Sequence, residues 1–351
     1  MSGSGSQALL PTTPGNGSGG SGSGGGLFPN GGNSGGSSSG GTSTSVTLAN
    51  AKQKKGVVTI VSTLRFQNAQ SAGTGMIISS DGEILTNNHV VNGATSIAVT
   101  VASTGKSYRA DVVGTAPTED VAVLQLRNAS DLTTAQLGQS DTVKVGDAVV
   151  GVGNAGGTGT LRASSGKVIA LNQTITASDG GSGSDIERLN GLIEVNAPII
   201  SGDSGGPLYD SSGDVVGMDT AASANPTVTQ AYAIPIKSAL TIADQIESGN
   251  ESSTIHIGLP AFLGVGVATD ATGSIDGAGV SSLLDGGPAA AAGITDGSVI
   301  TRVGDTRVHS GTALKTALSA HQPGDKVTIT WTDPAGTSHT ATVTLATGPA
   351  D

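Results

Sequence analysis

The sequence predicts a mainly β protein with two folded modules. Three observations lead to this prediction. The 351 residues are 36% apolar but only 2% aromatic, so Val, Ile, Leu and Ala must fill the cores. Short runs rich in β-branched residues recur, as at 57–61 and 327–331, and 56 glycines separate such runs. A chain of this length exceeds one ordinary domain, so we expect two cores.

Residues 1–48 consist mostly of Gly and Ser, with Pro and Asn between them. A segment of this composition buries too little apolar surface to offset the entropy lost on ordering, so we predict a disordered linker. We expect the first folded module over residues 49–248, where short apolar runs alternate with Asp-Gly and Ser-Gly turns. This pattern is typical of an antiparallel sandwich or a pair of β-barrels. Residues 237–248 form its one clear helix, because apolar side chains recur there at helical spacing.

The polar residues 249–257 predict a second linker, and the second module follows over residues 258–348. Short strands are expected to surround two helical segments in this module, at 288–293 and 311–321. The pattern therefore predicts a small α+β domain behind the larger β module.

Composition and charge exclude several classes of function. The formal net charge is −11 and no basic patch is visible, so we expect no nucleic-acid partner. The chain has no cysteine, which excludes disulfides, thiolate catalysis and Cys-ligated zinc. Its five histidines are scattered, so we predict no metal site and no cofactor. No run approaches the roughly 20 apolar residues that cross a bilayer, and the amino end lacks the pattern of a signal peptide.

The motif Gly-Asp-Ser-Gly-Gly at 202–206 makes Ser204 a candidate nucleophile. The motif also matches the Gly-x-Ser-x-Gly elbow of α/β-hydrolases, which would make the protein an esterase. That elbow needs a helix directly after the serine and a histidine later in the chain. Here Pro207 and a predicted hairpin of strands follow instead, so this alternative is disfavoured.

A serine nucleophile needs a histidine to take its proton and an acid to orient that histidine. His89 is the only histidine before Ser204, and it lies where an apolar strand gives way to a polar loop. Asp120 opens the apolar run 120–126, where a buried carboxylate requires a partner. The other acids that could take the third role are Asp81, Asp111, Glu119, Asp131, Asp141 and Asp147. The sequence thus predicts a catalytic triad of His89, Asp120 and Ser204.

The glycines of the same motif predict an oxyanion hole. Acyl transfer builds negative charge on a carbonyl oxygen, which backbone N–H groups must reach without a side chain in the way. We assign this role to the N–H groups of Gly202, Asp203 and Ser204. Gly205 and Gly206 then let the chain turn away.

Three stretches in this order, SAGTGMIISSDGEILTNNHVV, EDVAVLQL and SGDSGGPL, resemble the serine proteases of the chymotrypsin-like double β-barrel fold. They resemble the bacterial HtrA-type, DegP-like proteases more closely. The second module resembles a PDZ domain through FLGVGV at 262–267 and GGPAAAAGITDGSVITRVGDTRV at 286–308. The resemblance covers nearly all of residues 50–348. It implies a double β-barrel followed by a PDZ domain, and a serine endopeptidase that cleaves unfolded or misfolded proteins.

The resemblance also implies where substrates bind. The catalytic site would lie in a cleft between two six-stranded barrels, with the peptide pairing as an extra strand beside residues 217–223. Pro198 stands where trypsin-like enzymes carry an acid, so we expect cleavage after small or medium apolar residues. Ile199, Ile200 and Thr220 are the expected residues of the substrate pocket.

In the PDZ-like module, the backbone N–H groups of Leu263, Gly264 and Val265 are expected to bind the carboxylate of peptide C-termini. HtrA-type enzymes usually carry Asn before the nucleophile, whereas this chain has Asp203, which we expect to accept local backbone hydrogen bonds. Members of the resembled family are exported and commonly trimeric, which makes an extracytoplasmic location and a homotrimer further expectations. The alternative to a protease is a chaperone or peptide-binding scaffold in which the triad is little used.

Overall fold

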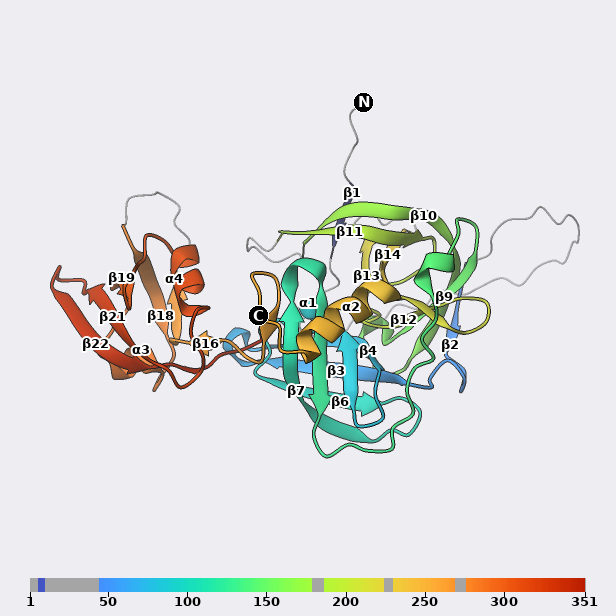
Figure 1. Cartoon of the computed structure of the whole chain (residues 1–351), viewed down its shortest axis with the longest axis horizontal. Coiled ribbons are helices and arrows are strands. Elements are labelled where there is room, and N and C mark those ends of the chain that lie inside the picture. The colour runs from blue at the N-terminus through green and yellow to red at the C-terminus, as the bar shows by residue number, and fades with distance from the viewer. Residues whose placement is uncertain (1–5, 10–43, 179–185, 224–229, 269–275, 351) are drawn as a thin grey trace, which may run out of the picture.

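The computed structural model describes residues 6–9, 44–178, 186–223, 230–268 and 276–350. Their strands form two large sheets, a smaller sheet and a two-stranded pair, connected by a few helices (Figure 1). The protein is therefore mainly β, as its composition predicts. Most of the expected linker over residues 1–48 lies outside the described residues. In the described part of the chain, no helix is both long enough and apolar enough to span a bilayer.

Six strands of the first module close into a barrel in the order β3, β4, β5, β8, β7 and β6. Their bounds are β3 Val57–Leu64, β4 Ala69–Ile77, β5 Glu83–Thr86, β6 Ser96–Val101, β7 Ser107–Ala116 and β8 Val121–Leu126. The barrel closes because β6 pairs with β3, and β8 pairs with both β5 and β7. Its interior holds fully buried aliphatic side chains, among them Ile60, Ile84 and Leu124.

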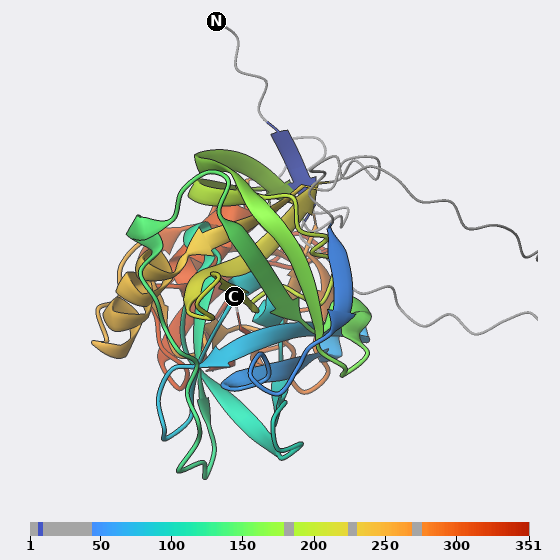
Figure 2. The same ribbon diagram turned by 90° about the vertical axis from the view of Figure 1, so that its right-hand side faces the viewer.

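A second barrel follows in the order β9, β10, β11, β14, β13 and β12. Its strands are β9 Ala148–Gly153, β10 Arg162–Ser178, β11 Ile186–Val195, β12 Pro207–Tyr209, β13 Val215–Ser223 and β14 Ala231–Pro235. It closes because β9 pairs with both β10 and β12. Figure 2 shows the blue and cyan strands of the first barrel below the green and yellow strands of the second. The first module is therefore a pair of barrels and not a sandwich.

Helix α2 (Ile236–Glu247) follows the second barrel and packs against the core between the two barrels. Its buried residues are Ala239, Ala243 and Ile246 of the predicted helical pattern, together with Ile236, the residue before the predicted helix. Ile242, the fourth position of that pattern, is only partly buried. The remaining helices of this module are short: α1 Asn88–Val91 and the 3-10 turns η1 Arg65–Gln67, η2 Pro117–Glu119, η3 Ser140–Thr142 and η4 Ala155–Gly157.

Two short strands near the amino terminus add to β10. β1 (Ser6–Leu9) pairs with it in parallel, and β2 (Ser45–Leu48) pairs antiparallel to residues 162–165. Val46 and Leu48 remain exposed, so β2 is held by backbone hydrogen bonds more than by burial. Neither strand is expected from the composition of residues 1–48, because backbone pairing leaves little trace in side-chain patterns.

The second module is a sheet in the order β17, β18, β19, β21 and β22, with two helices on it. The strands are β17 Val265–Val267, β18 Ala278–Leu283, β19 Val299–Val303, β20 Thr306–Arg307, β21 Lys326–Thr332 and β22 Ser338–Thr344. Helix α3 spans Pro288–Ala291, and α4 spans Gly311–Leu318 with Ser310 as its N-cap. A separate pair joins β16 (Ala261–Phe262) to β23 (Ala346–Thr347). The core is aliphatic around Trp331, so this module folds as the small α+β domain predicted.

The segment between the modules is attached to the first barrel. Residues 256–257 form β15 (His256–Ile257), which pairs with Thr115 and Gly114 at the edge of β7. The expected linker 249–257 thus ends in a strand. The chain returns to the first barrel after the second module. There the N–H of Gly93 donates to the carbonyl of Ala350 at 2.7 Å, and the N–H of Ala350 donates to the carbonyl of Ala94 at 3.0 Å. Both connections hold the second module against the first barrel.

Candidate active site

The predicted triad residues come from three separate elements where the two barrels meet. β5 ends at Thr86, and the polar residues after it start the one-turn helix α1, which carries His89. The side chain of Asn87 donates to the carbonyl of Asp120 at 2.9 Å, which ties the start of α1 to the start of β8. The change from the apolar strand β5 to the polar residues after it therefore places the imidazole of His89 where the two barrels meet.

Asp120 is fully buried and follows the 3-10 turn η2, one residue before β8 begins. Its backbone has a positive φ of 53°, a conformation that Asp tolerates better than most residues. The carboxylate lies 2.9 Å from His89 Nδ1 and also accepts the backbone N–H of His89 at 3.0 Å. A third donor is the hydroxyl of Thr220. These three donors offset the cost of burying the charge, and they fix both the position and the tautomer of the imidazole.

Ser204 is buried at the same junction, but its hydroxyl is turned away from His89. Ser204 Oγ donates to the carbonyl of Thr220 at 3.1 Å, and His89 Nε2 has no partner among the described residues. The structure thus joins His89 to Asp120 directly and connects Ser204 to them through Thr220. Hydrogen bonds between nucleophile and base are often long or poorly aligned in free enzymes and tighten when substrate binds.

Two of the three N–H groups assigned to the oxyanion hole are available. Within the described residues, the N–H groups of Gly202 and Ser204 donate to no acceptor. Gly202 has a φ of +93°, and a Cβ there would lie 2.3 Å from the carbonyl oxygen of Asn154, so only glycine fits. The assignment of Asp203 is wrong, because its N–H donates to the carbonyl of Ile200 at 3.0 Å. The turn at Gly202 rotates that N–H back into the loop.

The three residues expected to line the substrate pocket lie in different environments. Ile199 is buried in the core of the second barrel, whereas Ile200 is 51% exposed. Thr220 is buried, with its hydroxyl on Asp120 and its carbonyl on Ser204. The side chain of Thr220 therefore supports the triad and does not line a pocket. The small residues around Thr220 in the sequence do not predict that its hydroxyl would bond to Asp120.

Two acidic side chains, Asp203 and Asp219, lie next to the predicted triad, and the sequence does not indicate that they form a pair. Asp203 accepts the N–H of Ile200 at 2.9 Å, which agrees with the expected local backbone bond. Burial raises the pKa of Asp203 to about 7, against the opposing effects of that N–H and of Arg162. Burial, and next the charge of Asp203, raise the pKa of Asp219 well above its usual range. Both groups are thus disposed to hold a proton near neutral pH.

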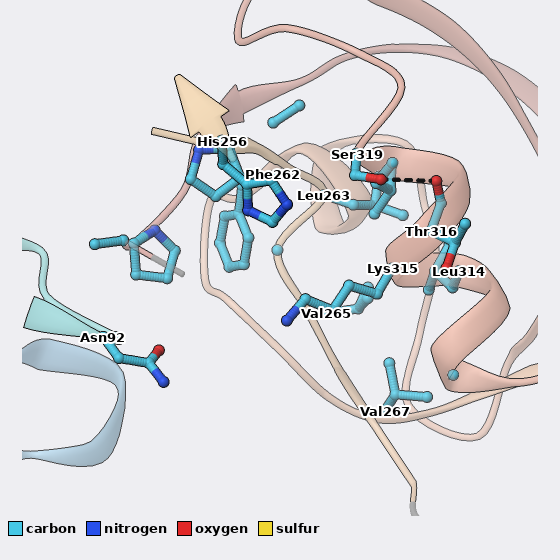
Figure 3. A pocket seen from close by; sticks show the side chains of 18 of the residues that line it. Asn92, His256, Phe262, Leu263, Val265, Val267, Leu314, Lys315, Thr316 and Ser319 are labelled. Carbon is cyan, nitrogen blue, oxygen red and sulfur yellow. Dashed lines mark hydrogen bonds between the residues drawn. The ribbon is translucent and has the colours of Figure 1, made fainter. Parts of the chain in front are cut away.

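A groove between β17 and α4 of the second module opens into a cavity of about 610 Å³, which the segment between the modules and the first barrel also line (Figure 3). Leu263, Gly264 and Val265, the residues expected to bind a carboxylate, all line this groove. Its other apolar lining residues include Phe262, Val267, Leu314 and Leu318. Lys315 extends from α4 into the cavity, and Asn92 of the first barrel faces it from the other side (Figure 3).

Both modules match known protein families. Residues 73–218 match the family described as trypsin-like peptidase domain, and residues 261–344 match the PDZ domain family. The periplasmic pH-dependent serine endoprotease DegQ of Escherichia coli is 35% identical over 271 residues, covering 75% of this chain and 57% of DegQ. The serine protease PepD of Mycobacterium tuberculosis is 34% identical over 319 residues, covering 86% of this chain and 66% of PepD. The chain thus spans 57% and 66% of the length of these two relatives.

Proposed function

Because the chain belongs to the HtrA family of trypsin-like serine proteases with a PDZ domain, we propose that it is a serine endopeptidase acting on unfolded or misfolded proteins. The observation that carries the proposal is the bonding of Asp120. Its buried carboxylate holds the imidazole of His89 and the hydroxyl of Thr220, and the carbonyl of the same Thr220 accepts Ser204. Base, orienting acid and nucleophile thus meet in one cluster, although 31 and 84 residues separate them in the chain.

The reaction begins when Ser204 Oγ turns from Thr220 towards His89, a rotation about one side-chain bond. His89 Nε2 then accepts the hydroxyl proton while Oγ attacks the peptide carbonyl. The oxyanion of the tetrahedral intermediate accepts from the N–H groups of Gly202 and Ser204. His89 passes its proton to the leaving amine, which leaves an acyl-enzyme. Water attacks the acyl-enzyme through the same base and restores Ser204.

The groove of the PDZ domain supports recognition of peptide C-termini. The N–H groups of Leu263 and Gly264 have no acceptor among the described residues, so they are free to bind a terminal carboxylate. The apolar lining accommodates an aliphatic last side chain, and the peptide adds as a strand beside β17. Lys315 lines the same cavity, and its positive charge favours an acidic residue in the peptide, some positions before the C-terminus.

We further propose a protease domain over residues 49–248 and a PDZ domain over 258–348, which extend beyond the matched ranges 73–218 and 261–344. Because DegQ is periplasmic by name, we also propose an extracytoplasmic location. Trimerisation, common in the family, is the proposed assembly. The alternative, a chaperone or peptide-binding scaffold with little proteolytic activity, is not favoured, because the relatives are named proteases and one module matches a trypsin-like peptidase domain.

The test is labelling with a fluorophosphonate, which reacts with activated serines, followed by identification of the labelled residue. We expect the label on Ser204 and none in Ser204→Ala, which should also lose hydrolysis of casein without a change in melting temperature. Ser211→Ala is the matched control, because Ser211 lies in the exposed turn between β12 and β13. Full casein hydrolysis by Ser204→Ala would refute the proposed function.

A further inference from the structure

Two carboxyl groups beside the nucleophile have no role in the proposed mechanism. Asp203 directly precedes Ser204, and Asp219 directly precedes Thr220. Both residues are buried, with exposed fractions of 3% and 0%. Acidic side chains are almost never buried so fully unless donors or cations surround them. We call Asp203 and Asp219 the acidic pair.

The acidic pair packs against one strand of the second barrel, β9. A Cβ on Gly151 would lie 2.7 Å from Asp219 Oδ2, and a Cβ on Gly153 would lie 2.6 Å from Asp203 Oδ1. Residues two apart on a strand share a face and lie roughly 6–7 Å from each other. The two glycines therefore leave the space that the carboxyl groups fill, and they make Asp203 and Asp219 neighbours.

The described residues offer the acidic pair a single hydrogen-bond donor. Ile200 N–H donates to Asp203 Oδ2 at 2.9 Å, whereas Asp203 Oδ1 and both oxygens of Asp219 have no partner there. An ionised carboxylate in a buried site ordinarily requires several donors. The site consequently suits the neutral form of both groups, in agreement with the direction in which burial moves their pKa values.

Asp203 also closes the loop that presents the oxyanion donors. Its N–H donates to the carbonyl of Ile200, and its carboxyl group accepts the N–H of the same residue. These reciprocal bonds close a tight loop over residues 200–203. Gly202 lies inside the loop, so the direction of its N–H depends on the loop staying closed.

We propose that Asp203 is a positioning residue whose protonated carboxyl group keeps this oxyanion loop closed, and whose ionisation opens it. The inference rests on the proposed proteolytic function, because the loop affects a rate only if it stabilises an oxyanion. A charged Asp203 has one donor in a buried site, so turning towards solvent lowers its free energy. Ile200 then loses its acceptor, and Gly202 N–H is no longer held in place.

The charged groups around the acidic pair identify which member titrates. Arg162, the first residue of β10, is the cation that acts on Asp203. Asp203 is the charge that acts on Asp219. Asp120 and His89 lie beyond Thr220 and bond to each other. The first proton leaves from Asp203, and Asp219, which is buried more completely and lies next to the new charge, stays protonated.

The test compares the pH dependence of kcat/KM for the full chain, Asp203→Asn and Asp219→Asn. For the unchanged protein, kcat/KM should fall above about pH 7, by up to about tenfold per pH unit. Asparagine still accepts the N–H of Ile200 but cannot ionise, so the profile of Asp203→Asn, scaled to its own maximum, should lack this decline. Asp219→Asn should keep the decline.

Infrared difference spectra provide a readout that does not depend on activity. A protonated-carboxyl band should disappear as the pH rises through neutrality, and Asp203→Asn should lack that band. A profile without an alkaline decline, the same decline in Asp203→Asn, or its loss in Asp219→Asn alone overturns the proposal. If the protein hydrolyses nothing and no serine is labelled, the proposed function fails. The infrared titration still decides whether Asp203 ionises near neutral pH.

Discussion

Replacing Thr220 by valine tests whether its hydroxyl supports the triad. Valine keeps the size and β-branching of threonine but removes the donor to Asp120 Oδ2, leaving the buried carboxylate with the two donors of His89. A hydrogen bond to a charged group contributes about 1.5–3 kcal/mol. If Thr220→Val loses this contribution in the transition state, where His89 carries the proton, kcat/KM falls by about 10- to 150-fold. The conversion uses about 1.36 kcal/mol for each factor of ten.

The assay is kcat/KM on an internally quenched peptide, with the melting temperature measured in parallel. Thr220→Ser is the matched control, because it restores the hydroxyl on a smaller side chain and should recover most of the activity. The backbone carbonyl that accepts Ser204 is present in both variants, so their difference isolates the hydroxyl. Unchanged kcat/KM in Thr220→Val, or an equal loss in Thr220→Ser, would refute the reasoning.

Three other changes test separate parts of the structure. Gly202→Ala should lower kcat by about 100-fold or more without unfolding the chain, because its Cβ would lie 2.3 Å from the carbonyl oxygen of Asn154; near-normal turnover contradicts this. The raised pKa of Asp203, about 7 against the ordinary 3.8, means that the folded state binds the proton more tightly. Stability should therefore fall by up to about 4 kcal/mol as pH rises from about 4 to 7. Urea unfolding should show a weaker pH dependence in Asp203→Asn, and an unchanged slope would exclude this contribution. Lys315→Glu should weaken binding of a peptide with an apolar C-terminus and an upstream acid, measured by anisotropy at low salt, but not of its uncharged counterpart; equal effects on both peptides would rule out charge recognition.

Sequence alone narrows the proposed nucleophile and base to single residues, whereas the proposed acid has six competitors. Ser204 lies in a glycine-rich motif, and His89 is the only histidine before it. Asp120 was chosen for the apolar run that follows it, and the structure buries it fully. Chemistry that depends on residue type and chain order is visible in a sequence.

Contacts that depend on local backbone rotation could not be predicted in this way. The N–H of Asp203 points back to Ile200 because of the turn at Gly202, so its assignment to the oxyanion hole was wrong. The pairing of residues 256–257 with β7 was also missed, because a two-residue strand has no periodicity. Its position is set by Gly114, where a Cβ would lie 2.5 Å from the carbonyl oxygen of His256.

An irregularity in β13 explains why one strand serves both the triad and the acidic pair. In the pairing of β13 with β14, Asp219 lies opposite Ala233 and Ala221 lies opposite Tyr232, so Thr220 is the extra residue of a β-bulge. A bulge redirects side chains relative to the regular alternation of a strand. Here it accompanies a Thr220 hydroxyl that reaches Asp120 and an Asp219 carboxyl that faces β9. Shifting β13 by one residue would therefore break the support of the triad and remove the neighbour of Asp203 together.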